Sequence, residues 1–397
     1  MHLSPKEIFF KHIAQTSPAP LGLEIDKAED IYIYDTNGNK YIDFISGIAV
    51  SSVGHQHPEI KKAIVNQLNK YAHIMVYGET IQQPQTDYIK TLMPYLPDSL
   101  DCIYFVNSGA EAIEGAMKLS KAYTQRSEII SFENAYHGST QGALSIAGNE
   151  WLKTQFRPLI PGNKILPWNN IDALDEISNQ TAAVFIEPIR GEAGVQIPSE
   201  NFIKALRKKC NETGSLLVMD EIQTGFGRTG KLFAFEHFGV VPDILVLGKA
   251  MGGGLPIGAF IAHHSVMQVF TNHPLGHLTT FGGNAVCVAS ALASLKVILE
   301  NNLIENAVTI EKILKEELSH PLIKEVRVKG AMCAVELESE KLVMKTIENA
   351  LKNGLMIDWF LFAPNCIRIA PPLIISNDEL KDGIRRLIQS IPNEYDN

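Results

Sequence analysis

The segment 243–260, DILVLGKAMGGGLPIGAF, places one lysine, Lys249, between an apolar run and a glycine-rich loop. The run has the length and composition of a buried strand. An amine at the end of such a strand is partly removed from water, which lowers its pKa and makes it nucleophilic toward an aldehyde. Gly248 and the glycines at 252–254 leave room for a bulky ring beside it. For Lys249 alone, however, a lysine whose ammonium simply reaches solvent is the better explanation.

Short apolar runs like this one recur through the middle of the chain, separated by helix-like stretches such as 111–124. This alternation predicts an α/β fold whose large domain has a mostly parallel sheet with helices on both faces. The runs are CIYFV (102–106), EIISF (128–132), AAVFIEP (182–188), SLLVMDE (215–221) and DILVLG (243–248).

The two ends of the chain have a different pattern. Residues 31–44, IYIYDTNGNKYIDF, alternate on either side of Asn37-Gly38 and predict a β-hairpin. We expect residues 1–50 to contribute this hairpin to a small domain and residues 51–291 to form the large domain. Residues 292–397, with VRVKG, MCAVELE and CIRIAPPL between amphipathic helices, should form a small α+β domain.

Composition narrows the possible functions. The 397 residues include 35 Lys and Arg and 44 Asp and Glu, a net charge of −9, so nothing favours nucleic acid or an anionic membrane as a partner. None of the five cysteines forms a CxxC pair, which favours a reduced cytoplasmic protein. No secretion signal or membrane-spanning run is apparent, and we expect no bound metal.

Polar residues follow the apolar runs, where an α/β sheet binds its ligands. They are Asn107-Ser108-Gly109, Glu187, Asp220-Glu221 and Lys249. Pyridoxal phosphate (PLP) requires three such groups together: a lysine for its aldehyde, an acid for its ring nitrogen and free amides for its phosphate. Each residue also has a simpler explanation, because Ser108 could only cap a helix and Asp220 could only pair with an Arg or Lys.

The glycines Gly225, Gly227 and Gly230 spell GxGxxG after a strand, a pattern typical of dinucleotide sites. That site needs a helix that opens at the glycines and an acid at the end of the next strand. Neither is convincing here, because the following KLFAFEHFGVVP is too short for a crossover helix and Asp243 precedes its strand. We interpret the glycines as a structural loop.

Nearly the whole chain resembles the class III PLP-dependent aminotransferases of fold type I, and especially their acetylornithine/ornithine branch. The most specific match is DEIQTGFGRTG followed by LGKAMGGGLPIGA, with 29 residues from Asp220 to Lys249. Other matching segments are DFISGIAVSSVGHQHP, NSGAEAIEGAMKLS, AYHGST, FIEPIRGEAGV, TTFGGN and IRIAPPL.

This resemblance implies that Lys249 forms the internal aldimine with PLP and then moves a proton between substrate and cofactor. It also implies that Asp220 keeps the pyridine nitrogen protonated. Thr280 matches a threonine that reaches the neighbouring subunit's cofactor, which implies a homodimer with shared active sites. The remaining implied cofactor contacts are Ser108, Gly109 and Ala110 at the phosphate, Tyr136 and Ile222 on the two ring faces, Gln223 at the phenolic oxygen, and His137 and Glu187.

On the substrate side, Arg368 and Glu192 match an arginine and a mobile glutamate in relatives that use 2-oxoglutarate. With Glu192 aside, Arg368 could bind an α-carboxylate; with Glu192 in place, the site could accept an uncharged ω-amine end. The resemblance therefore implies a ping-pong exchange between an ω-amine donor, with N-acetylornithine the leading candidate, and a keto acid.

One position departs from the family pattern. Ser139 replaces the arginine that usually follows HG and holds the donor's distal carboxylate, a task that a hydroxyl cannot perform. Arg190, where glutamine is frequent, is the candidate replacement, and a structural salt bridge is an equal alternative.

Several other functions stay open. They are an ω-aminotransferase for diamines or for amines without a distal carboxylate, a same-fold aminomutase or decarboxylating transaminase, an NAD-dependent oxidoreductase, and a non-catalytic interaction protein.

Overall fold

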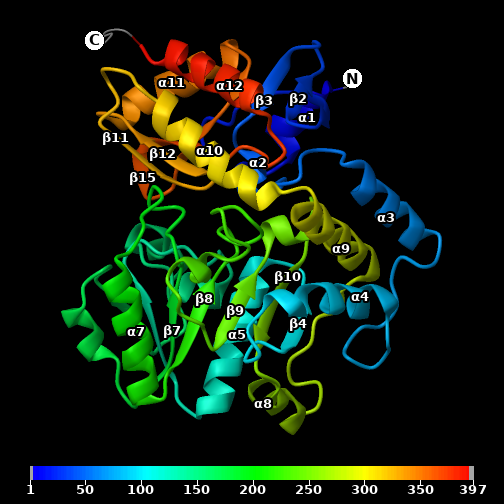
Figure 1. The fold of residues 1–397 in the computed structure, drawn as a ribbon, viewed down its shortest axis with the longest axis vertical. Coiled ribbons are helices and arrows are strands. Elements are labelled where there is room, and N and C mark those ends of the chain that lie inside the picture. Colours follow the sequence, from blue (N-terminus) through cyan, green and yellow to red (C-terminus); the bar gives the residue numbers. More distant parts are fainter. Residues whose placement is uncertain (1–2, 393–397) are drawn as a thin grey trace.

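The computed structural model describes residues 3–392, and a seven-stranded sheet forms its centre (Figure 1). The sheet is mostly parallel, as predicted, but β10 runs antiparallel to both of its neighbours, β4 and β9. In spatial order its strands are β4 (Cys102–Val106), β10 (Gly258–Ala262), β9 (Ile244–Leu247), β8 (Leu216–Asp220), β7 (Thr181–Ile186), β5 (Glu128–Phe132) and β6 (Asn163–Leu166).

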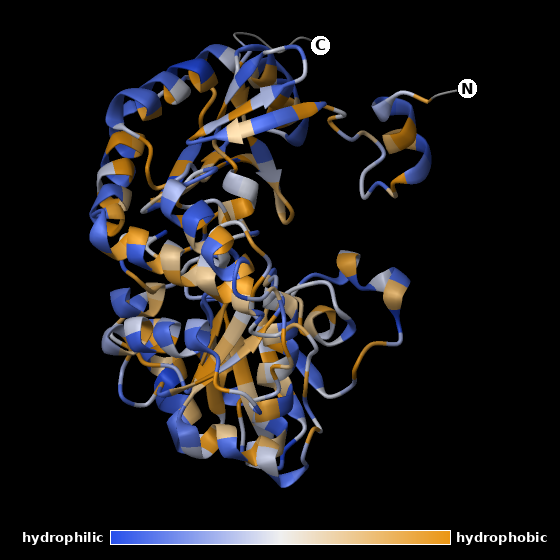
Figure 2. Ribbon diagram, turned by 90° about the vertical axis from the view of Figure 1, so that its right-hand side faces the viewer, coloured by the Kyte–Doolittle hydropathy of each residue, from blue (hydrophilic) through white to orange (hydrophobic). Residues whose placement is uncertain are grey.

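Both faces of this sheet are buried, and Figure 2 shows its strands as the most hydrophobic part of the ribbon. On one face, Val218 and Val246 pack with α5 (Gly109–Thr124). On the other face, Leu217 and Met219 pack with α7 (Glu200–Thr213), while α9 (Ala285–Glu300) packs against the turn Lys249–Gly252. Burial on both sides explains why the central strands read as continuous apolar runs.

The ends of the chain join in a second, four-stranded sheet. Its order is β1 (Ile25–Glu29), β2 (Tyr32–Asp35), β3 (Lys40–Asp43) and β13 (Leu355–Met356). β2 and β3 form the predicted hairpin, and Gly38 at φ +84° occupies its left-handed turn position. β13 pairs in parallel with β3, so residues more than 300 positions apart share one sheet.

A third sheet carries one part of the candidate site. Its order is β11 (Glu325–Lys329), β12 (Met332–Glu336), β15 (Ala363–Ile369) and β14 (Asp358–Phe360), all antiparallel. The domain boundaries expected from the sequence stay a prediction, and α9 continues through the boundary placed at residue 291.

The GxGxxG glycines lie in a turn-rich loop after β8, and no helix opens at them, in agreement with the structural interpretation. Within this loop Arg228 is fully buried. Its guanidinium donates to Ser52 Oγ at 2.7 Å and to the carbonyls of Ala331 and Pro371. Burial lowers the pKa of Arg228 to about 9. One guanidinium thus connects the large sheet to both the N-terminal and the C-terminal regions.

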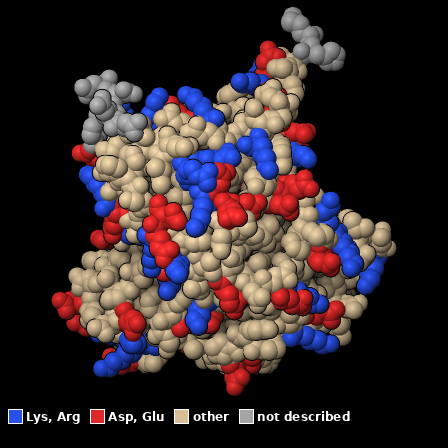
Figure 3. Space-filling view, turned by 45° about the horizontal axis from the view of Figure 1, so that its top comes forward, with Lys and Arg blue, Asp and Glu red and all other residues tan. Residues whose placement is uncertain are grey.

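The remaining helices surround these sheets. Among the described residues no single helix meets the length and hydropathy expected of a membrane span, although α9 and α10 meet them together across a 64° bend. Figure 3 shows acidic and basic side chains intermixed on the face that it views.

The remaining helices are α1 (Pro5–His12), α2 (Ser46–Ala49), α3 (Pro58–Leu68), α4 (Gln83–Leu92), α6 (Gln141–Ser145), α8 (His264–Met267), α10 (Leu303–Glu317), α11 (Glu340–Lys352) and α12 (Asn377–Ser390).

Candidate active site

The predicted polar strand ends converge at the carboxyl edge of the large sheet. Gly248, before Lys249, lies so close to the turn after β4 that an added Cβ would stand 3.4 Å from Gly109 Cα. The same Cβ would stand 3.3 Å from Ile222, which follows β8. Turns from three strands therefore meet beside Lys249, although β10 separates β4 from β9 in the sheet.

Lys249 begins a short 3₁₀ turn, Lys249–Gly252, with φ at +47°. A non-glycine residue in this left-handed region is strained by about 1–3 kcal/mol, and such strain often occurs at functional sites. Burial lowers the pKa of Lys249 below that of an ordinary lysine. Within the part of the chain that the structure describes, its Nζ has neither a hydrogen bond nor an ion pair. The amine is therefore free to react.

Asp220 ends β8 and is buried. Its Oδ2 lies 2.7 Å from Nδ1 of the buried His137, and its Oδ1 accepts a hydrogen bond from the Ile222 amide at 3.0 Å. The simpler explanation, a pair with Arg or Lys, is not what the structure shows. A histidine on one oxygen leaves this carboxylate able to face a further cationic group.

Ser108 is the N-cap of α5, and its hydroxyl accepts from the Glu111 amide at 3.2 Å. The helix begins at Gly109, two residues earlier than the sequence suggested, because this cap fixes its start. The amides of the first helical turn and the helix dipole make this end suitable for a phosphate. Gly109 is needed here, because a Cβ would lie 2.7 Å from Ile222.

Tyr136 and Ser139 lie on the loop that follows β5. The Tyr136 hydroxyl is 3.1 Å from the exposed Ser139 hydroxyl, and Gly138 between them lies against Ala110 of the phosphate turn. This loop therefore stands beside the anion site. The stacking role of Tyr136 stays a prediction.

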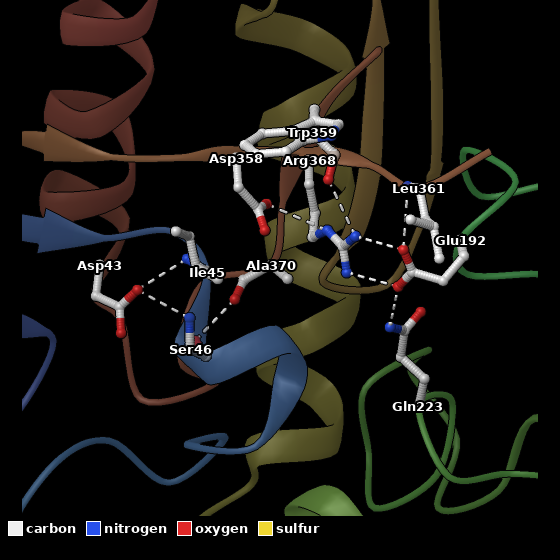
Figure 4. A network of polar contacts seen from close by, with 10 residues as sticks. All are labelled: Asp43, Ile45, Ser46, Glu192, Gln223, Asp358, Trp359, Leu361, Arg368 and Ala370. Atoms are coloured by element: carbon white, nitrogen blue, oxygen red, sulfur yellow. Dashed lines mark hydrogen bonds and ion pairs between the residues drawn. The ribbon is translucent and has the colours of Figure 1, made fainter. Parts of the chain in front are cut away.

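Glu192 and Arg368 form a buried, two-pronged ion pair between the loop after β7 and strand β15 (Figure 4). The two nitrogen–oxygen distances are 2.9 and 2.7 Å. Glu192 also accepts from Gln223 Nε2 at 3.2 Å. Although burial alone would raise the pKa of Glu192, the adjacent guanidinium holds that pKa below its ordinary value. The pairing expected from the sequence is observed, and its role toward substrate stays a prediction.

Sequence reasoning missed a second carboxylate at Arg368. Asp358 on β14 lies directly opposite Arg368 on β15, with Oδ1 3.2 Å from the guanidinium Nε (Figure 4). Burial raises the pKa of Asp358 to about 6. Only the register between the two strands reveals this contact, so the sequence carried no local signal for it.

The Arg190 side chain is held by partners within the protein. Its guanidinium lies 4.2 Å from the centroid of the Trp168 ring and donates to the Glu133 carbonyl. The side chain is buried, and burial lowers its pKa to about 10. The prediction that Arg190 holds a donor carboxylate is untested, and this geometry weighs against it.

Glu187 and Thr280 complete the predicted set. Both oxygens of the buried Glu187 accept backbone hydrogen bonds, from Tyr136 and Gly191, each at 3.0 Å. Glu187 therefore accepts from the protein backbone through both oxygens, and its predicted contact with the cofactor stays a prediction. Thr280 is exposed, while the neighbouring Thr279 accepts from Asn107 at 2.7 Å.

These residues fit PLP. Three groups meet around glycines that are too crowded to carry a side chain. They are an unpartnered lysine with a lowered pKa, a buried carboxylate beside a histidine, and a capped helix start. They would hold the aldehyde, the ring nitrogen and the phosphate, respectively. The described part of the chain contains no cluster of three or more His, Cys, Asp or Glu side chains that could hold a metal ion.

Comparison with known proteins agrees with this chemistry. Residues 13–391 match the family model "Aminotransferase class-III". The acetylornithine aminotransferase of Methanopyrus kandleri is 38% identical over 91% of this chain and 92% of its own length. The LysW-aminoadipate semialdehyde/glutamate semialdehyde transaminase of Sulfurisphaera tokodaii is also 38% identical, over 91% and 93%. Among solved structures, the Toxoplasma gondii ornithine aminotransferase superposes with a TM-score of 0.89 at 31% identity, over 97% and 94%. The chain therefore belongs to the class III aminotransferases.

Proposed function

We propose that this PLP-dependent aminotransferase moves the amino group of an ω- or side-chain amine to 2-oxoglutarate by a ping-pong exchange. N-acetylornithine is the leading donor. The observation that carries the proposal is the buried Glu192–Arg368 pair, because it gives one site two charge states. Relatives named for acetylornithine and for semialdehyde substrates support this donor class.

The residues around Lys249 divide the work. PLP, when bound, supplies an aldehyde and an electron-accepting ring. Lys249 Nζ, whose pKa burial lowers, is the amine that would take up a proton and return it. Asp220 would face the ring nitrogen, and His137 lies against one oxygen of its carboxyl group and would keep that group oriented. The start of α5 would hold the phosphate.

The Glu192–Arg368 pair, which we call the carboxylate gate, explains how two different substrates use one pocket. With Glu192 on Arg368, the guanidinium is neutralised and the site accepts an uncharged ω-amine end. With Glu192 withdrawn, the Arg368 fork binds the α-carboxylate of the keto acid. In the paired arrangement Gln223 also donates to Glu192.

A homodimer with shared active sites is part of the proposal. Thr280 is exposed, and the large apolar side chains Leu275, Leu278 and Phe281 around it are 40–61% exposed. A second copy would cover this surface and bring Thr280 to its cofactor phosphate. A cytoplasmic location stays a prediction from the sequence.

A second candidate is an ω-aminotransferase for diamines or for amines without a distal carboxylate. Ser139 supplies no cation and Arg190 lies on Trp168, so no arginine from either position awaits a donor carboxylate. The aminomutase, decarboxylating and NAD-dependent alternatives gain no support from the relatives.

The lowered pKa of Lys249 predicts the pH at which the cofactor-free protein reacts with PLP. Only the neutral amine attacks an aldehyde, so a depressed pKa moves the midpoint of attachment below the 10.5 of an ordinary lysine. Borohydride reduction followed by peptide mass spectrometry should find the label on Lys249. A midpoint at or above pH 10.5 would contradict this assignment. A label on another residue, together with a Lys249→Ala variant that still reacts with PLP, would contradict it as well.

Replacing Arg368 by Ala should raise the KM for 2-oxoglutarate at least about 30-fold, since losing one partner of a buried charge pair costs about 2 kcal/mol or more. The half-reaction with an amine donor should change far less. Arg368→Lys keeps the charge but loses the two-pronged geometry, so its KM for 2-oxoglutarate should lie between those of the native enzyme and Arg368→Ala. Stopped-flow measurement of each half-reaction checks this, and an equal loss in both would refute the gate.

Thr280 can be tested by mixing inactive subunits. Lys249→Ala and Thr280→Ala chains, each impaired alone, should regain activity when co-assembled, because one site of the mixed dimer then receives both native residues. Sedimentation measures the assembly and transaminase assays measure the activity. Mixed dimers that form but stay inactive would show that Thr280 does not serve the neighbouring site.

The reaction rates of different donors show which chemical group the site recognises at the donor's distal end. N-acetylornithine, ornithine, 4-aminobutyrate and an alkyl diamine should be compared in single-turnover reactions. We expect N-acetylornithine to react fastest, and Arg190→Gln to leave its apparent affinity within about threefold because Arg190 contacts Trp168. A winning diamine would favour the second candidate, and a large loss in Arg190→Gln would restore Arg190 as the carboxylate ligand.

A further inference from the structure

Glu187 is a buried carboxylate to which the mechanism above gives no chemical step. It follows β7 at the carboxyl edge of the sheet and is 6% exposed. Oε1 accepts a hydrogen bond from the Tyr136 amide and Oε2 accepts one from the Gly191 amide, both at 3.0 Å. One side chain thus bridges two loops that follow different strands.

Each bridged loop carries a residue of the proposed mechanism. The first loop presents Tyr136, and Gly138 on it abuts the phosphate turn at Ala110. The second loop is closed by a two-bond backbone bridge between Arg190 and Gln196 and presents Glu192 to Arg368. A shift at Glu187 would therefore move the ring face and the gate together.

Both oxygens of the Glu187 carboxyl accept from these two amides at once. A carboxylate has two acceptor oxygens, whereas a glutamine of the same shape has one acceptor and would turn its NH₂ toward the other N–H. A buried donor left facing a donor is expensive. Aspartate keeps both acceptors and the charge but is one methylene shorter, so it cannot keep both contacts without moving a loop.

The electrostatic surroundings of Glu187 are mixed. Burial raises its pKa to about 7, His137 and the two backbone hydrogen bonds oppose that rise, and Asp220 adds to it. Arg190 and Lys249 also feel its charge. A direct charge effect on the cofactor region is therefore a competing explanation that an experiment must separate from positioning.

We propose that Glu187 is a positioning residue that joins the Tyr136 loop to the Glu192 loop and so keeps the cofactor face and the carboxylate gate in register. The inference rests on the proposed function, because it uses the role given there to Glu192, and on the ring-stacking role that the family resemblance predicts for Tyr136.

The chain offers a matched control in Glu221. This carboxyl is also fully buried at a strand end, and burial likewise raises its pKa to about 7. It accepts from the Phe235 amide at 2.7 Å and from the Thr224 hydroxyl, so it braces the loop after β8, which carries Ile222 and Gln223, and it does not bridge the Tyr136 and Glu192 loops. Glu221→Gln therefore removes a comparable buried charge without touching the Tyr136 and Glu192 loops.

The test compares PLP-loaded Glu187→Gln, Glu187→Asp and Glu221→Gln with the native enzyme. The readouts are the visible circular dichroism of the cofactor, and KM and kcat for 2-oxoglutarate. Both Glu187 variants should weaken the cofactor ellipticity and raise KM about tenfold, the factor expected for losing one charge-assisted hydrogen bond, with kcat within about threefold. Glu221→Gln, which leaves the bridge between the Tyr136 and Glu192 loops intact, should keep the KM for 2-oxoglutarate within about threefold of the native value.

Other outcomes overturn the proposal. If Glu187→Asp behaves as the native enzyme while Glu187→Gln does not, the charge and not the position matters. If all three variants behave alike, the role is only structural. Glu187→Asp, which keeps the buried charge, remains informative if Glu187→Gln fails to fold. An Arg368→Ala enzyme with native KM would instead overturn the proposed gate, so the two failures are distinguishable.

Discussion

The buried pair between Glu192 and Arg368 is the constraint on which the rest of the site depends. It joins a loop of the large sheet to a strand of the C-terminal sheet (Figure 4). Removing one partner of such a pair costs about 3–5 kcal/mol, because the other charge is left buried and alone. Any substrate that separates the pair must therefore bring its own carboxylate. In the proposed exchange, this requirement selects the keto acid.

Arg368 has partners besides Glu192 that hold it against β14. Its Nε faces Asp358, one Nη donates to the Trp359 carbonyl at 3.1 Å, and its guanidinium carbon lies 4.6 Å from the centroid of the Phe360 ring. All three partners belong to β14. Glu192, in contrast, is held by side chains and a loop amide that lie on separate segments. The strand that holds Arg368 and the loop that carries Glu192 thus hold the two members of the pair in different ways.

The chemistry of the site could be read from the sequence because it lies at strand ends. Lys249 and Asp220 directly follow apolar runs, and parallel strands bring such positions to one edge. Features that depend on pairing between strands far apart in the sequence could not be predicted from the sequence. The insertion of β10 between β4 and β9 and the placement of Asp358 opposite Arg368 are both matters of register. Likewise, the stacking of Arg190 on Trp168 arises from packing between loops and has no local pattern.

The most direct measurement is a spectroscopic titration of the PLP-loaded enzyme through one complete cycle. N-acetylornithine alone should convert the absorbance of the aldehyde form of the cofactor to that of its amine form, and 2-oxoglutarate should then restore it with release of glutamate. Two substrates acting in turn on the site around Lys249 would produce this result. Absence of conversion with every ω-amine, or recovery of the first spectrum without any keto acid, would contradict the account.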